Sequence, residues 1–154
     1  MAKQEWTGLS EGQISKRLGR ILGVAFDAEP APGLGGSAGA LAEVGDLAWV
    51  ALQVERKHTH PAENVLQYWP WLERSRRRLV LVHVIAPDAR RRTGPRADLT
   101  SWLGSMMERV IPGRFTYRRL DLGSAEEAAQ LEAAIAAIVA VRGPMEARTI
   151  VSGL

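Results

Sequence analysis

Two stretches of the chain decide its fold: L-A-W-V-A-L-Q-V-E at residues 47–55 and L-V-L-V-H-V-I-A at residues 79–86. Both are almost continuously apolar, which is typical of strands that are buried on both faces of a sheet. The sequence between them predicts a helix that begins at Pro61, because proline suits the first helical position. Pro70 should kink that helix by removing one backbone donor. Since a helix connects the two strands, we expect them to be parallel.

The flanking sequence predicts further elements on both sides of this unit. Ser10-Glu11-Gly12-Gln13 fits a capping box, and the apolar spacing after it predicts an amphipathic helix over residues 11–22. A strand at residues 41–44 can pair with the first buried strand through a tight turn at Gly45-Asp46. The remaining segments predict a loop at 87–95, a helix at 99–110, a strand at 115–122 and a helix at 125–141 that Gly143-Pro144 ends.

This order of elements predicts an α/β fold, a three-layer α/β/α sandwich with a central mixed sheet. With 154 residues the chain can form one compact domain, which we place at residues 1–142, followed by a short tail at 143–154. The absence of cysteine excludes disulfides, thiolate metal sites and a cysteine nucleophile. No apolar run is long enough to span a membrane, and the polar start does not resemble a signal peptide. We therefore expect a cytoplasmic protein without a membrane partner.

The charge is distributed unevenly along the chain. Residues 56–119 carry 14 basic and five acidic side chains, whereas the segments on either side are both net acidic. Of the 20 basic residues, 17 are arginine, the side chain best suited to bidentate contacts with phosphate. This pattern favours a polyanionic partner, although a solvated basic face explains it equally well.

Glu55 and Lys57 stand at the end of the first buried strand. Alternation along a strand puts them on the same face, with Cα atoms about 6–7 Å apart. A carboxylate can bind a hard divalent cation, and an ammonium group beside it can hold or polarise an attacking water. Hydrolysis of a phosphodiester needs such a pair. Alone, a Glu-x-Lys pair is more often a surface ion pair.

The same region resembles the core of the PD-(D/E)xK nuclease superfamily. The resemblance rests on V-E-R-K at 54–57, P-A-E-N-V-L-Q-Y-W-P-W-L at 61–72 and L-V-L-V-H-V at 79–84, and it covers roughly residues 11–86. It implies a restriction-endonuclease-like core, here with an extra C-terminal strand and helix. It also implies that Asp46 and Glu55 bind Mg²⁺ or Mn²⁺ and that Lys57 is the catalytic lysine. Asn64 and Tyr68 match the spacing of a Gln-x-x-x-Tyr helix motif found in several branches, with Asn in place of Gln.

The second metal ligand is the weakest part of this hypothesis. If residues 47–54 form one straight strand, the carboxylates of Asp46 and Glu55 are about 30 Å apart and cannot share an ion. Asp46 can serve only if the chain folds back near Val50-Ala51. We rank Asp46 first, because the resemblance favours the nearest upstream acid. The alternative acids are Asp27, Glu29, Glu43 and Glu11.

The sequence also predicts residues that contact nucleic acid, with DNA favoured over RNA. If the arginine clusters flank the Glu55 cleft, they would grip phosphates without reading sequence. The predicted contacts are Arg56, His58, Asn64, Arg74, Arg77, Arg90, Arg91 and Arg92. His83 lies on an apolar strand, where a histidine is more often a satisfied core residue than a catalytic base. The first hypothesis is therefore a metal-dependent nuclease or a nuclease-derived domain. The alternative is an inactive module of the same fold that binds nucleic acid or a protein partner; a homodimer is left open.

Overall fold

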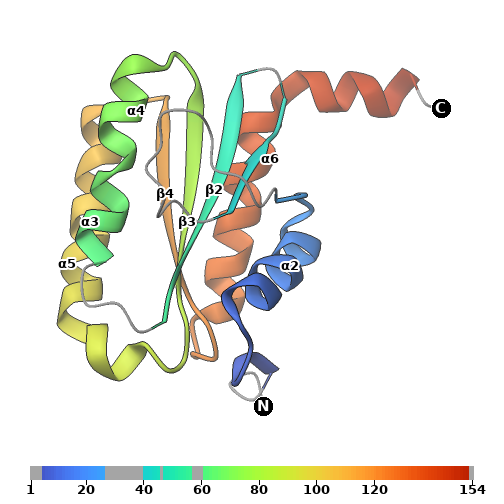
Figure 1. The fold of residues 1–154 in the computed structure, drawn as a ribbon. Helices are drawn as coiled ribbons and strands as arrows, with labels where there is room; N and C mark the ends of the chain where they lie inside the picture. The colour runs from blue at the N-terminus through green and yellow to red at the C-terminus, as the bar shows by residue number, and fades with distance from the viewer. Residues whose placement is uncertain (1–4, 27–39, 46, 57–60, 153–154) are drawn as a thin grey trace.

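The computed structural model describes residues 5–26, 40–45, 47–56 and 61–152, and shows an α/β fold with a four-stranded mixed sheet (Figure 1). The strands are β1 (Ala40–Glu43), β2 (Ala48–Glu55), β3 (Arg78–Ile85) and β4 (Phe115–Asp121). They lie side by side in the order β1-β2-β3-β4. β1 pairs with β2 antiparallel, whereas β2, β3 and β4 are parallel. The strands predicted from the apolar runs are thus confirmed, as is their parallel pairing.

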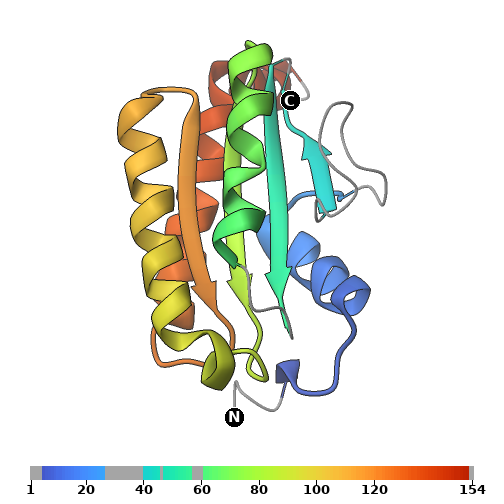
Figure 2. The ribbon, with the colours of Figure 1, turned by 60° about the vertical axis from the view of Figure 1, so that its left-hand side comes forward.

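Helices cover both faces of the sheet (Figure 2). On one face lie α3 (Pro61–Leu66), α4 (Tyr68–Arg74) and α5 (Arg90–Val110), and on the other lie α2 (Glu11–Leu22) and α6 (Glu127–Ser152). The α2 face has a continuous apolar core that includes Leu18, Leu52, Val82 and Ile138. The opposite face is apolar towards the amino ends of the parallel strands. Both faces are therefore closed to solvent over most of their area.

Local sequence accounts for two helix boundaries. Ser10 caps α2 as predicted: its hydroxyl accepts the backbone N–H of Gln13, and the Gln13 side chain accepts the backbone N–H of Ser10. The helix that begins at Pro61 is interrupted at Gln67, which separates α3 from α4. Pro70 explains this break, because a proline at that position cannot donate to the carbonyl of Leu66.

Two sequence predictions about helix limits are wrong. Residues 87–95 were expected to form a loop, but α5 begins at Arg90 and contains Pro95. A proline near the start of a helix removes only one hydrogen bond, so the helix can tolerate it. Gly143-Pro144 does not end α6, which continues to Ser152 through the predicted tail. Figure 1 shows that the helix bends and leads away from the sheet there, as proline kinks do.

Candidate functional site

A band of polar side chains crosses the sheet on the face covered by α3, α4 and α5. Gln53 of β2, His83 of β3 and Arg119 of β4 lie in register, and the next row contains Glu55 and Asp121. Both rows lie at the carboxyl ends of the three parallel strands, the edge where α/β proteins most often bind ligands. We therefore consider this edge the candidate functional site.

Glu55 is the centre of this band. Its side chain is completely buried. Its Oε1 atom accepts a hydrogen bond of 2.8 Å from the side-chain amide of Asn64 and lies 3.1 Å from Nε2 of His83. A buried carboxylate is expensive unless polar groups compensate it, and these contacts supply that compensation. They also fix the orientation of the carboxylate.

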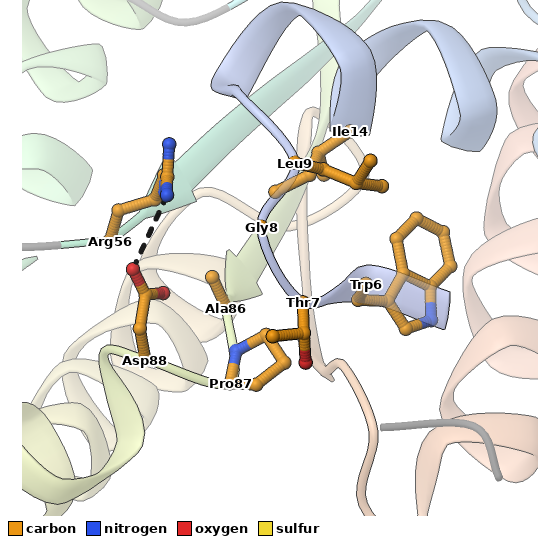
Figure 3. Close-up of a pocket in the computed structure, with 9 residues that line it drawn as sticks. All are labelled: Trp6, Thr7, Gly8, Leu9, Ile14, Arg56, Ala86, Pro87 and Asp88. Carbon is orange, nitrogen blue, oxygen red and sulfur yellow. Dashed lines mark hydrogen bonds and ion pairs between the residues drawn. The ribbon is translucent and has the colours of Figure 1, made fainter. Parts of the chain in front are cut away.

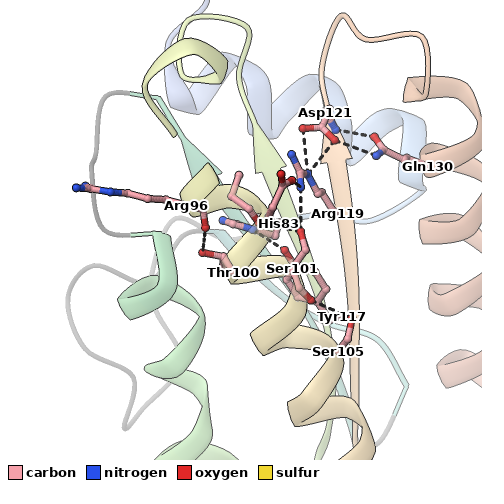
Figure 4. A network of polar contacts seen from close by, with 11 residues as sticks. His83, Arg96, Thr100, Ser101, Ser105, Tyr117, Arg119, Asp121 and Gln130 are labelled. Atoms are coloured by element: carbon pink, nitrogen blue, oxygen red, sulfur yellow. Dashed lines mark hydrogen bonds and ion pairs between the residues drawn. The ribbon is translucent and has the colours of Figure 1, made fainter. Parts of the chain in front are cut away.

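From His83 the polar contacts continue to Tyr117 on β4 and, through Tyr117, to Ser101 on α5; Figure 4 shows these three side chains. Nδ1 of His83 lies 2.8 Å from the hydroxyl of Tyr117. Burial raises the pKa of Tyr117 to about 12, against a smaller opposing effect of the hydrogen bond with Ser101, so this hydroxyl keeps its proton at neutral pH. If Tyr117 donates to Nδ1, the neutral imidazole carries its proton on Nε2 and donates it to Glu55. In this arrangement both ring nitrogens of His83 have a hydrogen-bond partner.

Arg119 anchors the β4 side of the band. Its guanidinium lies 2.8 Å from the carboxylate of Asp98 on α5 and 2.9 Å from that of Asp121, and it donates to Ser101 Oγ at 3.1 Å. Burial alone would lower the pKa of Arg119, but the two hydrogen-bonded carboxylates outweigh it and raise the pKa. Asp121 also accepts a hydrogen bond of 2.9 Å from Gln130. The carboxylate of Asp121 is therefore already bound by Arg119 and Gln130 within the protein.

A second set of contacts joins α3 and α4 to β2. Gln53 Oε1 accepts from the hydroxyl of Tyr68 at 3.3 Å and lies 3.4 Å from the side-chain amide of Gln67. Asn64 and Tyr68, which share a helix motif in the sequence, thus contact alternate residues of the strand that carries Glu55. The helical spacing of the motif matches the two-residue spacing along β2.

The predicted metal pair of Asp46 and Glu55 receives no support from the neighbouring residues. Asp46 lies outside the described residues, but β2 starts two residues after it and runs unbroken from Ala48 to Glu55. Those seven residue steps correspond to about 23 Å. The proposed fold-back at Val50-Ala51 is wrong, because both residues pair with β1 in regular register. The hairpin turn and Glu55 consequently lie at opposite ends of the strand.

The two alternative acids that the structure describes, Glu43 and Glu11, do not contact Glu55 either. Glu43 pairs with Trp49 near the hairpin turn and bonds to Arg77 at 2.9 Å, so it also lies far from Glu55. Glu11 is exposed in the first turn of α2. Asp27, Glu29, Lys57 and His58 lie outside the described residues. Within the described part of the chain, no group of three or more histidine, aspartate and glutamate side chains is placed to hold a metal ion.

The predicted nucleic-acid contacts separate into two groups. Arg56 lies at the carboxyl edge beside Glu55, where it forms a 3.4 Å ion pair with Asp88. Arg74 and Arg77 lie next to the start of β3, at the end of the sheet opposite Glu55. The expectation that both arginine clusters flank one cleft is therefore wrong for Arg74 and Arg77.

Three further residues that were predicted to contact nucleic acid lie, by their position in the backbone, at the carboxyl edge of the sheet. Arg90, Arg91 and Arg92 form the first turn of α5, which follows the carboxyl end of β3; their side chains lie outside the described residues. The backbone therefore brings these arginines to the end of the sheet that carries Arg56 and Glu55.

Sequence reasoning missed Gln53, Tyr117 and Arg119 as members of the site. A signal was present for Gln53 and His83, because each is a polar residue within an otherwise apolar strand. No comparable signal marks Tyr117, since an aromatic residue in a strand is ordinary core. Its role follows only from the pairing of β3 with β4.

Comparison of the chain with protein-family models, with curated proteins and with solved structures finds no match. Among the helices of the described residues, none is both long and apolar enough to cross a bilayer.

Proposed function

We propose that this chain is a nucleic-acid-processing domain with a restriction-endonuclease-like core that hydrolyses phosphodiesters with the help of Mg²⁺ or Mn²⁺. One observation carries the proposal: the amide of Asn64 donates to the carboxylate of Glu55 at 2.8 Å. Two short motifs, one on a strand and one on the following helix, resemble the nuclease superfamily independently. If the two motifs belong to one site, their residues must lie in contact, and Glu55 and Asn64 do. A chance similarity of two short motifs would not require this contact.

The order of elements is compatible with that core. A helix (α2), an antiparallel hairpin (β1 and β2), a crossover helix (α3 with α4) and a parallel strand (β3) follow one another along the chain. On this interpretation β4 and α6 are additions after the core. Glu55 then lies on the second strand of the hairpin, directly before the crossover.

The residues at this edge fit a magnesium ion in part. Mg²⁺ in phosphoryl-transfer sites is commonly held by one or two carboxylates together with substrate oxygens. Glu55 supplies one carboxylate, with Asn64 and His83 holding its Oε1 atom in place. A second protein ligand could come from outside the described residues, where Asp27 and Glu29 are acids that the regular β2 strand does not separate from Glu55 as it separates Asp46. When bound, the ion would neutralise charge that develops on the phosphate.

The chain's own residues have distinct roles in this proposal. Glu55 is the metal ligand, and Asn64, His83 and Tyr117 orient it through successive hydrogen bonds. Lys57, two residues further, would position the attacking water. Arg56, together with the arginines that begin α5, would contact the phosphates of the substrate.

The proposal is tested by incubating plasmid DNA, single-stranded DNA and RNA with the protein in Mg²⁺ or Mn²⁺. We expect metal-dependent cleavage that EDTA abolishes and that falls by about two orders of magnitude or more in Glu55→Gln and Lys57→Ala. Glu63→Gln is the matched control, because Glu63 is exposed and precedes Asn64 on the same helix. Melting curves check that each variant is folded. Absence of cleavage of all three substrates in either metal would overturn the proposal.

A second candidate, a non-catalytic nucleic-acid-binding module, is favoured by a different observation. Glu55 is fully buried and already engaged, whereas Arg74, Arg76 and Arg78 are exposed at the opposite end of the sheet. Such a module would bind nucleic acid with an affinity that falls steeply with salt. It would show no cleavage in any metal, and Arg76→Gln/Arg78→Gln would weaken its binding while Glu55→Gln would not.

A further inference from the structure

A small cleft opens beside the candidate site, on the α2 side of the sheet (Figure 3). It lies between the N-terminal segment around Trp6–Leu9 and the carboxyl ends of β2 and β3. Its volume is about 190 Å³. Drug-sized ligands occupy clefts of about 300–1,000 Å³, so this cleft suits a single small ring system.

The walls of the cleft are mainly apolar. Trp6, Leu9, Ile14, Ala86 and Pro87 line it. Trp6 is 3% exposed and is held in place by the guanidinium of Arg17, which lies 5.3 Å from the centroid of the indole ring. Because Trp6 is almost completely buried, its ring is a fixed support beneath the cleft, and the rigid apolar wall favours a flat ring over a flexible or strongly hydrated group.

One side of the cleft is polar. Arg56 and Asp88 line it and form an ion pair with each other at 3.4 Å. The Nε atom of Arg56 is buried and has no hydrogen-bond partner among the described residues. The end of the Arg56 side chain remains partly exposed, at 27%, so its terminal amino groups can donate a hydrogen bond to an acceptor on a ligand in the cleft. The Asp88 carboxylate, which is 46% exposed, can accept a hydrogen bond from the same ligand.

We propose that this cleft binds a nucleobase, the flat ring with donors and acceptors on its edge that these walls and this polar side fit together. The inference rests on the proposed function for its choice of ligand. Arg56 directly follows Glu55, and alternation along the strand turns the two side chains to opposite faces. A base in the cleft therefore belongs to the nucleotide at Glu55 only if its sugar and phosphate cross the carboxyl end of β2 from the α2 side to the α3 side of the sheet, and we include this path in the proposal. The cleft anchors one nucleotide beside the scissile phosphate.

The test uses the full chain, labelled with ¹⁵N, in EDTA and without added metal. It is titrated with the four ribonucleoside 5′-monophosphates and, separately, with ribose 5-phosphate, which carries the same phosphate without a base. We expect at least one monophosphate to bind about tenfold more tightly than ribose 5-phosphate, because the contacts with the apolar wall and with the polar side of the cleft require the base. The amide signals of Thr7, Gly8 and Asp88 should shift.

Two variants and one control sharpen this test. Leu9→Trp should fill the cleft and reduce monophosphate binding by at least about tenfold, and Arg56→Gln should reduce it without filling the cleft. Arg20→Gln removes an equal charge from the exposed last turn of α2 and should leave binding unchanged. If Leu9→Trp fails to fold, Arg56→Gln decides the outcome through the preference for the monophosphate over ribose 5-phosphate. This preference should fall if Arg56 contacts the base and stay unchanged if Arg56 contacts only the phosphate, which both ligands carry.

Three results would overturn the inference: equal binding of ribose 5-phosphate, no binding of any monophosphate, or unchanged binding in both cleft variants. Because the readout needs neither metal nor cleavage, it is separable from the test of the nuclease. Base binding without cleavage would support the cleft and count against hydrolysis. Cleavage without base binding would support hydrolysis and remove the cleft from the mechanism.

Discussion

The two faces of the sheet are built on different principles. On the α2 and α6 face, β2 and β3 form an apolar core in which Val54 and Val84 reach the carboxyl ends. β4 adds Leu120 to this core, and the half-buried Thr116 and Arg118 lie beside it. On the α3, α4 and α5 face, the same strands are continuously apolar only in their amino halves, although Ile85 packs with Ala89 and Ala97 near the carboxyl end. Their carboxyl halves present Gln53, Glu55 and His83, all buried.

The comparison singles out the carboxyl half of the α3, α4 and α5 face, because its buried polar side chains are not explained by folding stability alone. A buried polar network gains little free energy of folding over an apolar core of the same shape, and it is costly if any member loses its partner. The α2 and α6 face shows that β2 and β3 can be packed at their carboxyl ends without such groups. The polar half of the other face is therefore best explained by the need to hold Glu55 in a defined orientation at the edge of the sheet.

The largest effect should come from the apolar face. Leu52 is completely buried there, so Leu52→Ala should reduce the free energy of unfolding by about 2–5 kcal/mol, through lost burial and the cavity left behind. Urea denaturation measures this. Leu81→Ala, in the apolar half of the other face, is the matched variant and should cost a similar amount. A loss of less than 1 kcal/mol in either variant would show that its face is loosely packed.

A smaller effect is expected when the polar network is broken at Tyr117. Tyr117→Phe removes the hydroxyl 2.8 Å from His83 and leaves a buried ring nitrogen without this partner. We expect a loss of about 1–3 kcal/mol in the free energy of unfolding. Tyr68→Phe is the control, since the hydroxyl of Tyr68 contacts Gln53 at a longer distance, 3.3 Å, and its loss should cost less. Equal costs in the two variants would contradict the special role given to the His83 contact.

The smallest effect is a dependence of stability on alkaline pH. The pKa of Tyr117 is raised from 10.0 to about 12 in the folded protein, chiefly by burial. The folded state therefore holds this proton more tightly, and the resulting stability is complete below pH 10 and lost as the pH rises towards 12. Between pH 8 and pH 11 the loss should be about 1.4 kcal/mol by urea denaturation. Tyr117→Phe should lack this component, and an identical pH profile in that variant would refute its assignment to Tyr117.

The candidate site could be predicted from sequence only in part. Glu55 and Asn64 were found because they are close in the chain and belong to short motifs with characteristic spacing. Arg74 and Arg77 were misplaced, because a run of charge does not reveal at which end of a sheet it will lie. Asp46 was ranked first because it is the nearest acid before Glu55 in the sequence. The straight strand β2 lies between them, so residues near in sequence are far apart in space.

The sequence by itself determined the order of strands and helices, the capping of α2 and the parallel pairing of β2 with β3. These depend on interactions within a few residues and on the geometry of a short crossover, so local pattern suffices. Only the tertiary structure decided that His83, Tyr117 and Arg119 join Glu55 in one network. Such partners come from three strands and depend on register, which is set by the packing of the whole sheet and leaves no trace in the spacing of any one segment.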